Sequence, residues 1–199
     1  MARPRTFDEE RALDAAMRTF WEKGYEATST QDLCDATGLG RSSIYNTFKS
    51  KHDLFERALA HYLDTKRAPQ EAVLEDAGRP AAERVRALLS GVVEGETEHR
   101  ATAGRALGCL GVNTIVELGE RDGGAASLLK RDADRRLAAY RAVMEAGRRD
   151  GSITSTRDPE ALARFLNAVI AGLRVSSQGG ADRSVLEAVA DTAMDALTA

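Results

Sequence analysis

The sequence contains few cysteines, histidines, prolines and aromatic residues. Two of the 199 residues are Cys, three are His, four are Pro, and 5% are aromatic. Cys34 and Cys109 are far apart, and neither has His52, His61 or His99 at a metal-ligand spacing, so we expect no metal site and no cofactor. The chain also has no secretory leader and no apolar run of 18 residues, and we therefore expect it in a reducing cytoplasm and not in a membrane.

The patterns of common catalytic sites are missing as well. The sequence contains no HExxH, GxSxG, CxxC, Walker or Rossmann motif. None of the histidines has a neighbour in the sequence that would complete an acid–base pair. We therefore expect that the protein is not an enzyme.

The sequence also lacks an excess of positive charge. It has 28 Lys and Arg residues against 31 Asp and Glu residues, a net charge of −3 and a pI of about 5.7. Proteins that bind nucleic acid without sequence preference are usually basic overall, so this composition argues against that class. Any DNA binding must come from a local placement of positive charge, which favours a selective reader.

Helical periodicity extends along the chain, without a strand pattern, an internal repeat or a low-complexity tract. We predict an all-α protein with an N-terminal domain over residues 1–50 and a helical body over residues 51–199. A first helix should begin at Thr6 and stop at Gly24, and a helix from Lys51 should end near Arg67, before Pro69. Apolar stripes mark further helices over residues 85–93, 107–118, 128–143, 158–178 and 182–197, with Gly123 and Gly124 between the second and third.

Residues 28–54 have the pattern of two short helices joined by a tight turn. The first has cap candidates, an acid in its first turn and two inward residues: Thr28, Ser29, Thr30, Asp32, Leu33 and Ala36. Gly38 suits a left-handed turn, and Gly40 begins a second helix in which Ile44 and Phe48 face inward. This arrangement is typical of a helix-turn-helix.

The second helix is followed by a basic stretch. From Leu39 to His52 the chain carries Arg41, Lys49 and Lys51 and no acidic residue. Ser50 is predicted to cap the next helix, whose first N–H groups could hold a phosphate. Arg3 and Arg5 at the N-terminus could reach a minor groove or could simply be solvated.

Residues 7–62 resemble the DNA-binding domain of the tetracycline-repressor (TetR) family of bacterial transcription factors. The resemblance is carried by Phe20, Gly24, Tyr25, Thr28 and Ser29, by Ala36, Gly38 and Leu39, and by Ile44, Tyr45, Phe48, Lys51 and Leu54. Gly40 and Cys34 depart from the usual pattern, in which Ser or Asp and Ala are common. The resemblance implies major-groove contacts from Arg41, Ser42 and Ser43 and phosphate contacts from Thr30, Tyr45, Asn46 and Lys51. It also implies repression from a palindromic double-stranded DNA operator, relieved by a small-molecule effector.

Residues 158–197 are expected to form the interface of a homodimer. Both predicted helices of this region have wide apolar faces, which one subunit alone would not cover. An ordinary intramolecular core is the alternative. A dimer would place two recognition helices about 34 Å apart, the spacing at which a palindrome is read.

The family resemblance places the effector among the middle helices. Candidate lining residues are Leu89, Val92, Leu107, Leu110, Ile115, Val143 and Phe165, although ordinary core packing explains the same residues. Residues 108–119 further resemble a branch of the family that includes repressors inactivated by electrophiles or oxidants through a cysteine. Cys109 would be that cysteine, with Arg105 one helical turn before it to favour the thiolate. The alternative is an inert buried thiol, which we also expect of Cys34.

A function from another class stays open at this point. The helix-turn-helix could serve as a protein-interaction module without specific DNA readout, which the balanced charge of the N-terminal part permits. The acid-free stretch from Leu39 to His52 favours DNA.

Overall fold

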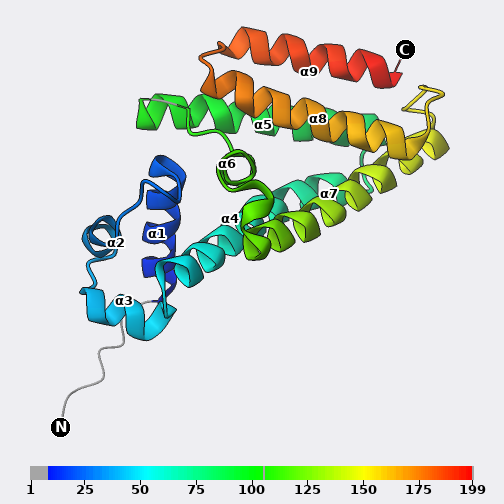
Figure 1. Ribbon diagram of the computed structural model, residues 1–199. Helices are drawn as coiled ribbons and strands as arrows, with labels where there is room; N and C mark the ends of the chain where they lie inside the picture. The colour runs from blue at the N-terminus through cyan, green and yellow to red at the C-terminus, as the bar shows by residue number, and fades with distance from the viewer. Residues whose placement is uncertain (1–8, 105, 199) are drawn as a thin grey trace. The chain divides into compact units, whose positions relative to one another are not determined.

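The computed structural model describes residues 9–104 and 106–198, and their regular elements are all helical (Figure 1). The order is α1 (Glu9–Lys23), α2 (Thr30–Thr37), α3 (Arg41–Phe48), α4 (Lys51–Glu75), α5 (Ala81–Ala103), α6 (Leu110–Glu117), the 3-10 turn η1 (Gly119–Arg121), α7 (Gly123–Asp150), α8 (Pro159–Gln178) and α9 (Arg183–Thr198). The prediction of an all-α fold is confirmed.

The chain forms two compact units. Unit 1 contains the residues up to Thr65 together with Leu110–Leu129, and unit 2 contains Lys66–Cys109 and Lys130–Ala199. Helices α4 and α7 each contribute residues to both units, because both are long. The functional division predicted between residues 50 and 51 stays a prediction, since packing divides the chain differently.

Unit 1 is built on the three-helix arrangement of α1, α2 and α3 around the start of α4 (Figure 1). Its core contains the fully buried side chains of Phe20, Leu33, Ile44, Phe48 and Leu54. The ring of Phe20 packs edge-on against Phe55, with the centroids 5.1 Å apart. Ala36 is exposed, so its predicted inward position is wrong: α2 has only two turns, and Leu33 alone fills the core from it.

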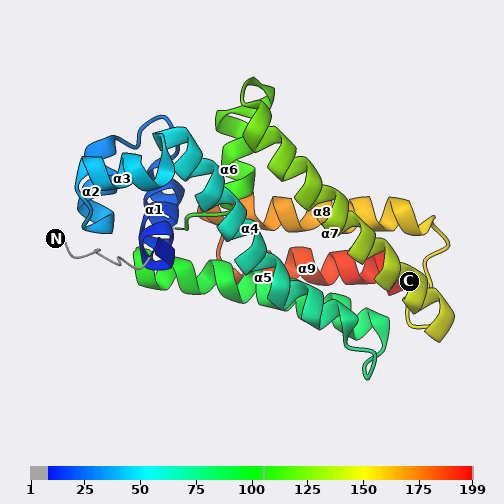
Figure 2. The same cartoon turned by 90° about the horizontal axis from the view of Figure 1, so that it is seen from below.

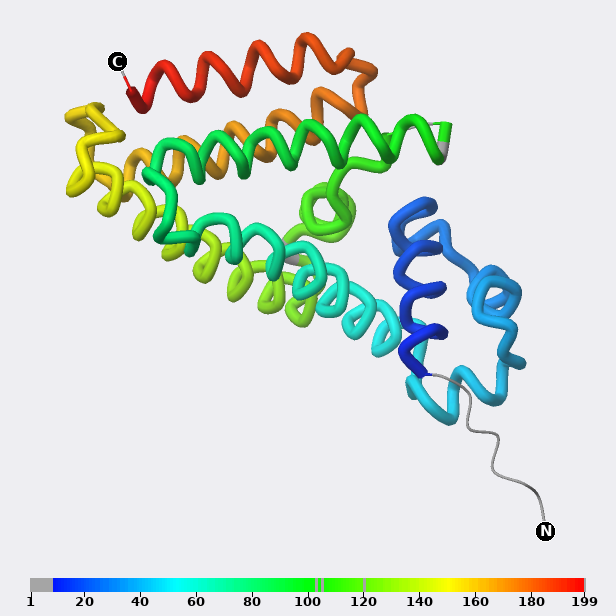
Figure 3. The backbone as a smooth tube through the Cα atoms, turned by 180° about the vertical axis from the view of Figure 1, so that it is seen from behind, coloured from blue at the N-terminus to red at the C-terminus, as the bar shows by residue number. Residues whose placement is uncertain are grey.

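Unit 2 is a helical bundle in which α5, α8 and α9 run side by side (Figures 2 and 3). Its apolar core draws on these helices, the end of α4 and the second half of α7, with Leu89, Tyr140, Met144 and Leu166 among its most buried members. Asp158 caps α8 as predicted, accepting hydrogen bonds from the N–H groups of Glu160 and Ala161 at 3.1 and 3.3 Å.

Three predicted helix boundaries are wrong. Helix α4 does not break at Pro69 but continues to Glu75; Pro69 is exposed there, so water can satisfy the carbonyl group that its missing N–H would have met. Gly123 and Gly124 form the first turn of α7, because Asp122 accepts hydrogen bonds from the N–H groups of Gly124 and Ala125 at 3.1 and 3.0 Å. Residues 106–109 are not helical, and α6 begins only at Leu110.

Candidate DNA-binding surface and buried polar cluster

Helix α2 is held at its start by a capping box. The Asp32 N–H donates to Ser29 Oγ at 3.1 Å, and the Ser29 N–H donates back to Asp32 Oδ2 at 2.8 Å. Lys23 at the end of α1 lies 2.5 Å from the Asp32 carboxylate, and its hydrogen bond, together with those from Ser29, lowers the pKa of Asp32. The cap therefore also ties α2 to α1.

The turn between α2 and α3 depends on glycine. Gly38 has a φ of 69°, a left-handed conformation that strains other residues, and its N–H closes α2 on the Cys34 carbonyl at 2.9 Å. Gly40 begins α3 without a side-chain cap, which matches its departure from the family pattern. At the far end of α3, Lys49 has a φ of 55°, the only positive φ of a non-glycine residue among the described residues.

Helix α3 has one buried face and one polar exposed face. Ile44 and Phe48 are buried, as predicted, while the opposite face exposes Arg41, Ser42, Tyr45 and Asn46 and half-exposes Ser43. A helix of this width fits the major groove, and these side-chain types can donate to base edges and phosphates. The structure therefore brings the predicted major-groove residues together on one surface, here called the α3 face.

The remaining predicted phosphate contacts lie next to the α3 face. The hydroxyl groups of Thr30 on α2 and Tyr45 on α3 are 3.1 Å apart. The Lys51 ammonium lies 4.5 Å from the centroid of the Tyr25 ring and 3.5 Å from the Glu26 carbonyl oxygen, beside the start of α4. Ser50 caps α4 as predicted, accepting from the Asp53 N–H at 3.0 Å.

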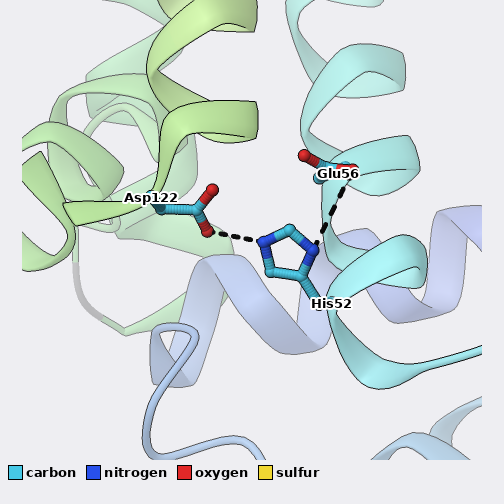
Figure 4. A group of neighbouring side chains, drawn as sticks. All are labelled: His52, Glu56 and Asp122. Atoms are coloured by element: carbon cyan, nitrogen blue, oxygen red, sulfur yellow. Dashed lines mark hydrogen bonds and ion pairs between the residues drawn. The ribbon is translucent and has the colours of Figure 1, made fainter. Parts of the chain in front are cut away.

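Sequence reasoning missed two contacts that join the α1–α2 turn and the start of α4 to the α6–α7 segment of the same unit. The Glu117 carboxylate accepts hydrogen bonds from the backbone N–H groups of Tyr25 and Glu26 at 2.9 and 2.8 Å. His52 Nε2 lies 2.7 Å from Asp122 Oδ2, and Nδ1 of the same ring lies 3.9 Å from Glu56 (Figure 4). Apart from the pair with Glu56, these partners are 70 to 92 positions apart, so no local pattern could reveal them.

His52, Glu56 and Asp122 are also the residues best placed to hold a metal ion, since their ligand atoms lie within 4.8 Å of one another. The two ring nitrogens of His52, however, face different carboxylates (Figure 4). Although burial raises the pKa of Asp122, hydrogen bonds from the Ala125 N–H and from His52 lower it overall, which keeps the carboxylate ionised. The group is therefore explained as an imidazole bridging two acids on α4 and at the start of α7.

Unit 2 contains a group of buried and half-buried polar side chains, here called the polar cluster: Lys66, Glu96, Cys109, Tyr140, Arg174 and Ser177. Glu96 is 8% exposed and Tyr140 is 1% exposed, and within the described part of the chain neither Glu96 Oε2 nor Tyr140 Oη has a hydrogen-bond partner. Burial raises the pKa of Glu96, lowers that of Lys66, and raises that of Tyr140 to about 12. Sequence reasoning missed this cluster because its members come from four helices and one loop.

Comparison with known proteins assigns the chain to a family. Residues 12–58 match the family model of bacterial regulatory proteins of the tetR family, and residues 81–193 match the model of the tetracyclin repressor-like C-terminal domain. The chain belongs to the tetR family of bacterial regulatory proteins. This membership confirms the resemblance seen in the sequence and extends it over the helical body; it also identifies a regulatory protein and not an enzyme.

Several relatives of this tetR-family chain match it over nearly its full length. It is 33% identical to the HTH-type transcriptional repressor ComR of Escherichia coli (strain K12) over 195 residues, or 96% of this chain and 90% of ComR. It is 31% identical over 201 residues to the uncharacterized HTH-type transcriptional regulator YezE of Bacillus subtilis (strain 168), covering 99% of this chain and all of YezE. A cysteine-substituted variant of the TetR family regulator CifR, solved in complex with 26 bp double-strand operator DNA, matches with a TM-score of 0.85 and 33% identity over 98% of this chain and 100% of that one.

The predicted effector-lining residues are divided between the two units of this family member. Leu89, Val92 and Val143 are part of the apolar core of unit 2, and Leu107 is buried outside that core. Leu110 and Ile115 belong to unit 1. Ile115 and Phe165 are 57% and 39% exposed, and the role of the seven residues in effector binding stays a prediction. Apolar periodicity marks a buried stripe, but it cannot distinguish core from cavity or from subunit interface.

The surroundings of Cys109 also differ from the prediction. Arg105 lies outside the described residues, and residues 106–109 are not helical, so the helix assumed over this segment is wrong. Within unit 2, Lys66 interacts electrostatically with Cys109. The loop that carries Cys109 is fixed to α8, where Gln178 donates a hydrogen bond to the Leu107 carbonyl at 2.8 Å. Cys109 is buried and Cys34 half-buried.

The outer face of α8 and α9 is apolar. Val185, Val189 and Phe165 are 50%, 40% and 39% exposed, and with Val169 and Ala188 they line a shallow groove between the two helices. No helix of the described residues is long and apolar enough to cross a membrane. The wide apolar faces predicted over residues 158–197 are thus present, and part of them is not covered by the chain itself.

Proposed function

We propose that this tetR-family chain is a dimeric, sequence-specific transcriptional repressor that reads a palindromic DNA operator in the cytoplasm. The observation that carries the proposal is the α3 face: a polar, acid-free surface on a short helix whose other side is anchored by Ile44 and Phe48. Arg41, Ser42 and Ser43 would contact base edges, while Thr30, Tyr45, Asn46 and Lys51 would position α3 on the phosphates.

The proposed dimer forms through residues 158–197. The partly exposed valines and Phe165 of the α8–α9 groove support this, because monomers rarely leave such a patch uncovered. A two-fold axis would bury the same groove of both subunits. The two α3 faces would then read the two halves of the operator.

Release from DNA is proposed to follow binding of a small molecule in unit 2 or modification of Cys109. Helices α4 and α7 support such coupling, because each contributes residues both to the unit that reads DNA and to the unit with the polar cluster. Lys66 is an electrostatic neighbour of Cys109 in the same unit. Treatment with N-ethylmaleimide should weaken operator binding by the wild type more than by Cys109→Ser; equal sensitivity would remove Cys109 from the release mechanism.

The function is tested by selecting bound duplexes from a random double-stranded DNA library. We expect a palindrome, bound more weakly as salt rises. Arg41→Ala should weaken binding of the selected duplex by about 1–3 kcal/mol for each base that the arginine recognises. Arg131→Ala, which changes an exposed arginine of α7, should bind the duplex as the wild type does. Failure of the folded dimer to enrich any sequence would contradict the proposal and favour a protein-interaction module.

A further inference from the structure

The carboxylate of Glu117 is fastened to the turn between α1 and α2. Glu117 is the last residue of α6 and is half-buried. Its two carboxylate oxygens each accept one backbone N–H, from Tyr25 at 2.9 Å and from Glu26 at 2.8 Å. A Cβ at Gly24, whose φ is 82°, would lie 3.0 Å from both of these oxygens. The carboxylate can therefore lie this close to the turn because residue 24 has no side chain.

The same turn holds the side chain of Lys51, the first residue of α4. The Lys51 ammonium lies 4.5 Å from the centroid of the Tyr25 ring and 3.5 Å from the Glu26 carbonyl oxygen. The Tyr25 ring is itself packed against Phe55, with the ring centroids 4.7 Å apart. Tyr25 and Glu26 thus bind the Glu117 carboxylate through their N–H groups and present a ring and a carbonyl oxygen to Lys51.

The negative charge of Glu117 works against DNA binding by itself. Phosphates repel a carboxylate, so an acid in the unit that reads DNA lowers its affinity unless it has another effect there. A lysine contributes most when its flexible side chain is already held close to the phosphate, because ordering a long side chain costs conformational entropy. Fixing the backbone of Tyr25 and Glu26 lowers that cost for Lys51.

We propose that Glu117 is a positioning residue for DNA binding, which acts through the α1–α2 turn to hold Lys51 in place for a backbone phosphate. This deepens the proposed function and rests on it, because Lys51 is assigned there to a phosphate. Glu117 does not contact DNA itself. Its carboxylate fixes the backbone of Tyr25 and Glu26, and these two residues hold the Lys51 ammonium.

The first test is a double-mutant cycle that measures binding of the selected operator by the full-length protein. Glu117→Ala should weaken binding about tenfold and lower the salt slope by about 1 per subunit, since one phosphate contact is lost from each subunit. In the Lys51→Gln background the same change should have no further effect on affinity or slope. Glu117→Gln keeps one acceptor oxygen and should lose less affinity than Glu117→Ala. Glu10→Ala, which removes an exposed acid of α1, is the matched control and should bind at least as well as the wild type.

The second test needs no DNA. Protons held over an aromatic ring are shifted upfield in NMR spectra by the ring current, so the side-chain signals of Lys51 should be shifted by Tyr25. The Lys51→Gln spectrum identifies these signals. Glu117→Ala should move them towards the values of a solvated lysine, while Glu10→Ala should leave them in place.

Three results would overturn the proposal: operator binding by Glu117→Ala that equals or exceeds that of the wild type, a loss that is equally large in the Lys51→Gln background, or Lys51 signals that do not move. Circular dichroism checks that each variant is folded, and Glu117→Gln carries the same comparisons if Glu117→Ala does not fold. A wild type that binds no operator, while Glu117→Ala still moves the Lys51 signals, would contradict the proposed function and leave the positioning of Lys51 by Glu117 standing.

Discussion

At the residue scale, Glu96 should make stability depend on pH. Because its folded pKa is raised, the native state binds the proton more tightly than the unfolded chain does. Its contribution to the free energy of unfolding is therefore full below the ordinary pKa of Glu and is lost as the pH rises through the raised value. Glu96→Gln should gain stability over the wild type, by about 1 kcal/mol at pH 8, and the gain should vanish near pH 4. Urea unfolding between pH 4 and pH 8 measures the free energy of unfolding of both proteins. A gain in stability that does not change with pH would contradict the prediction.

Substitutions of Tyr45 and of Lys51 should weaken DNA binding in ways that can be told apart. Tyr45→Phe removes a neutral exposed hydroxyl, so operator affinity should fall by about 1 kcal/mol per subunit without changing the salt dependence. Lys51→Gln removes a charge and should lower the salt slope by about 1 per subunit. Salt titrations of the selected operator separate the two, and an unchanged slope in Lys51→Gln would show that this lysine does not contact a phosphate.

At the element scale, substituting Glu117 should show how much the contact between α6 and the α1–α2 turn contributes to stability. Glu117→Ala leaves the N–H groups of Tyr25 and Glu26 without their acceptor, which should cost about 1–2 kcal/mol and speed amide exchange at these two residues. Glu94→Ala, at an exposed position of α5, is the control. Unchanged exchange at Tyr25 and Glu26 would mean that the contact is not formed in solution.

The elements were predictable where local chemistry decides them. The Gly38 turn, the Ser50 and Asp158 caps, the two anchors of α3 and the exposed sides of that helix all follow from spacing and residue type. Pro69 shows the converse. Local rules predict that the helix ends before this proline, but the long α4 continues through it. Glu117, Asp122 and the polar cluster could not be predicted, because each contact joins residues that only tertiary folding brings together.

At the scale of the whole molecule, the α8–α9 groove should decide whether the protein can repress. If two copies join there, a charge placed in the groove is buried without a partner in the dimer but stays solvated in the monomer. Val185→Glu should therefore give a folded monomer at micromolar concentration, with little change in the stability of the subunit. Light scattering measures the mass, and circular dichroism checks the fold.

The same substitution at another exposed valine separates a dimer interface from a general effect of added charge. Val116 on α6 is 82% exposed and lies outside the groove, so Val116→Glu should remain dimeric. The Val185→Glu monomer keeps its α3 face intact and should still contact a half-site, but it cannot reach the second half of the palindrome. Its operator affinity should fall by at least about a hundredfold, because two linked half-sites bind far more tightly than one. A Val185→Glu protein that stays dimeric would place the interface on another surface. That other interface would then have to set the distance between the two α3 helices of the dimer.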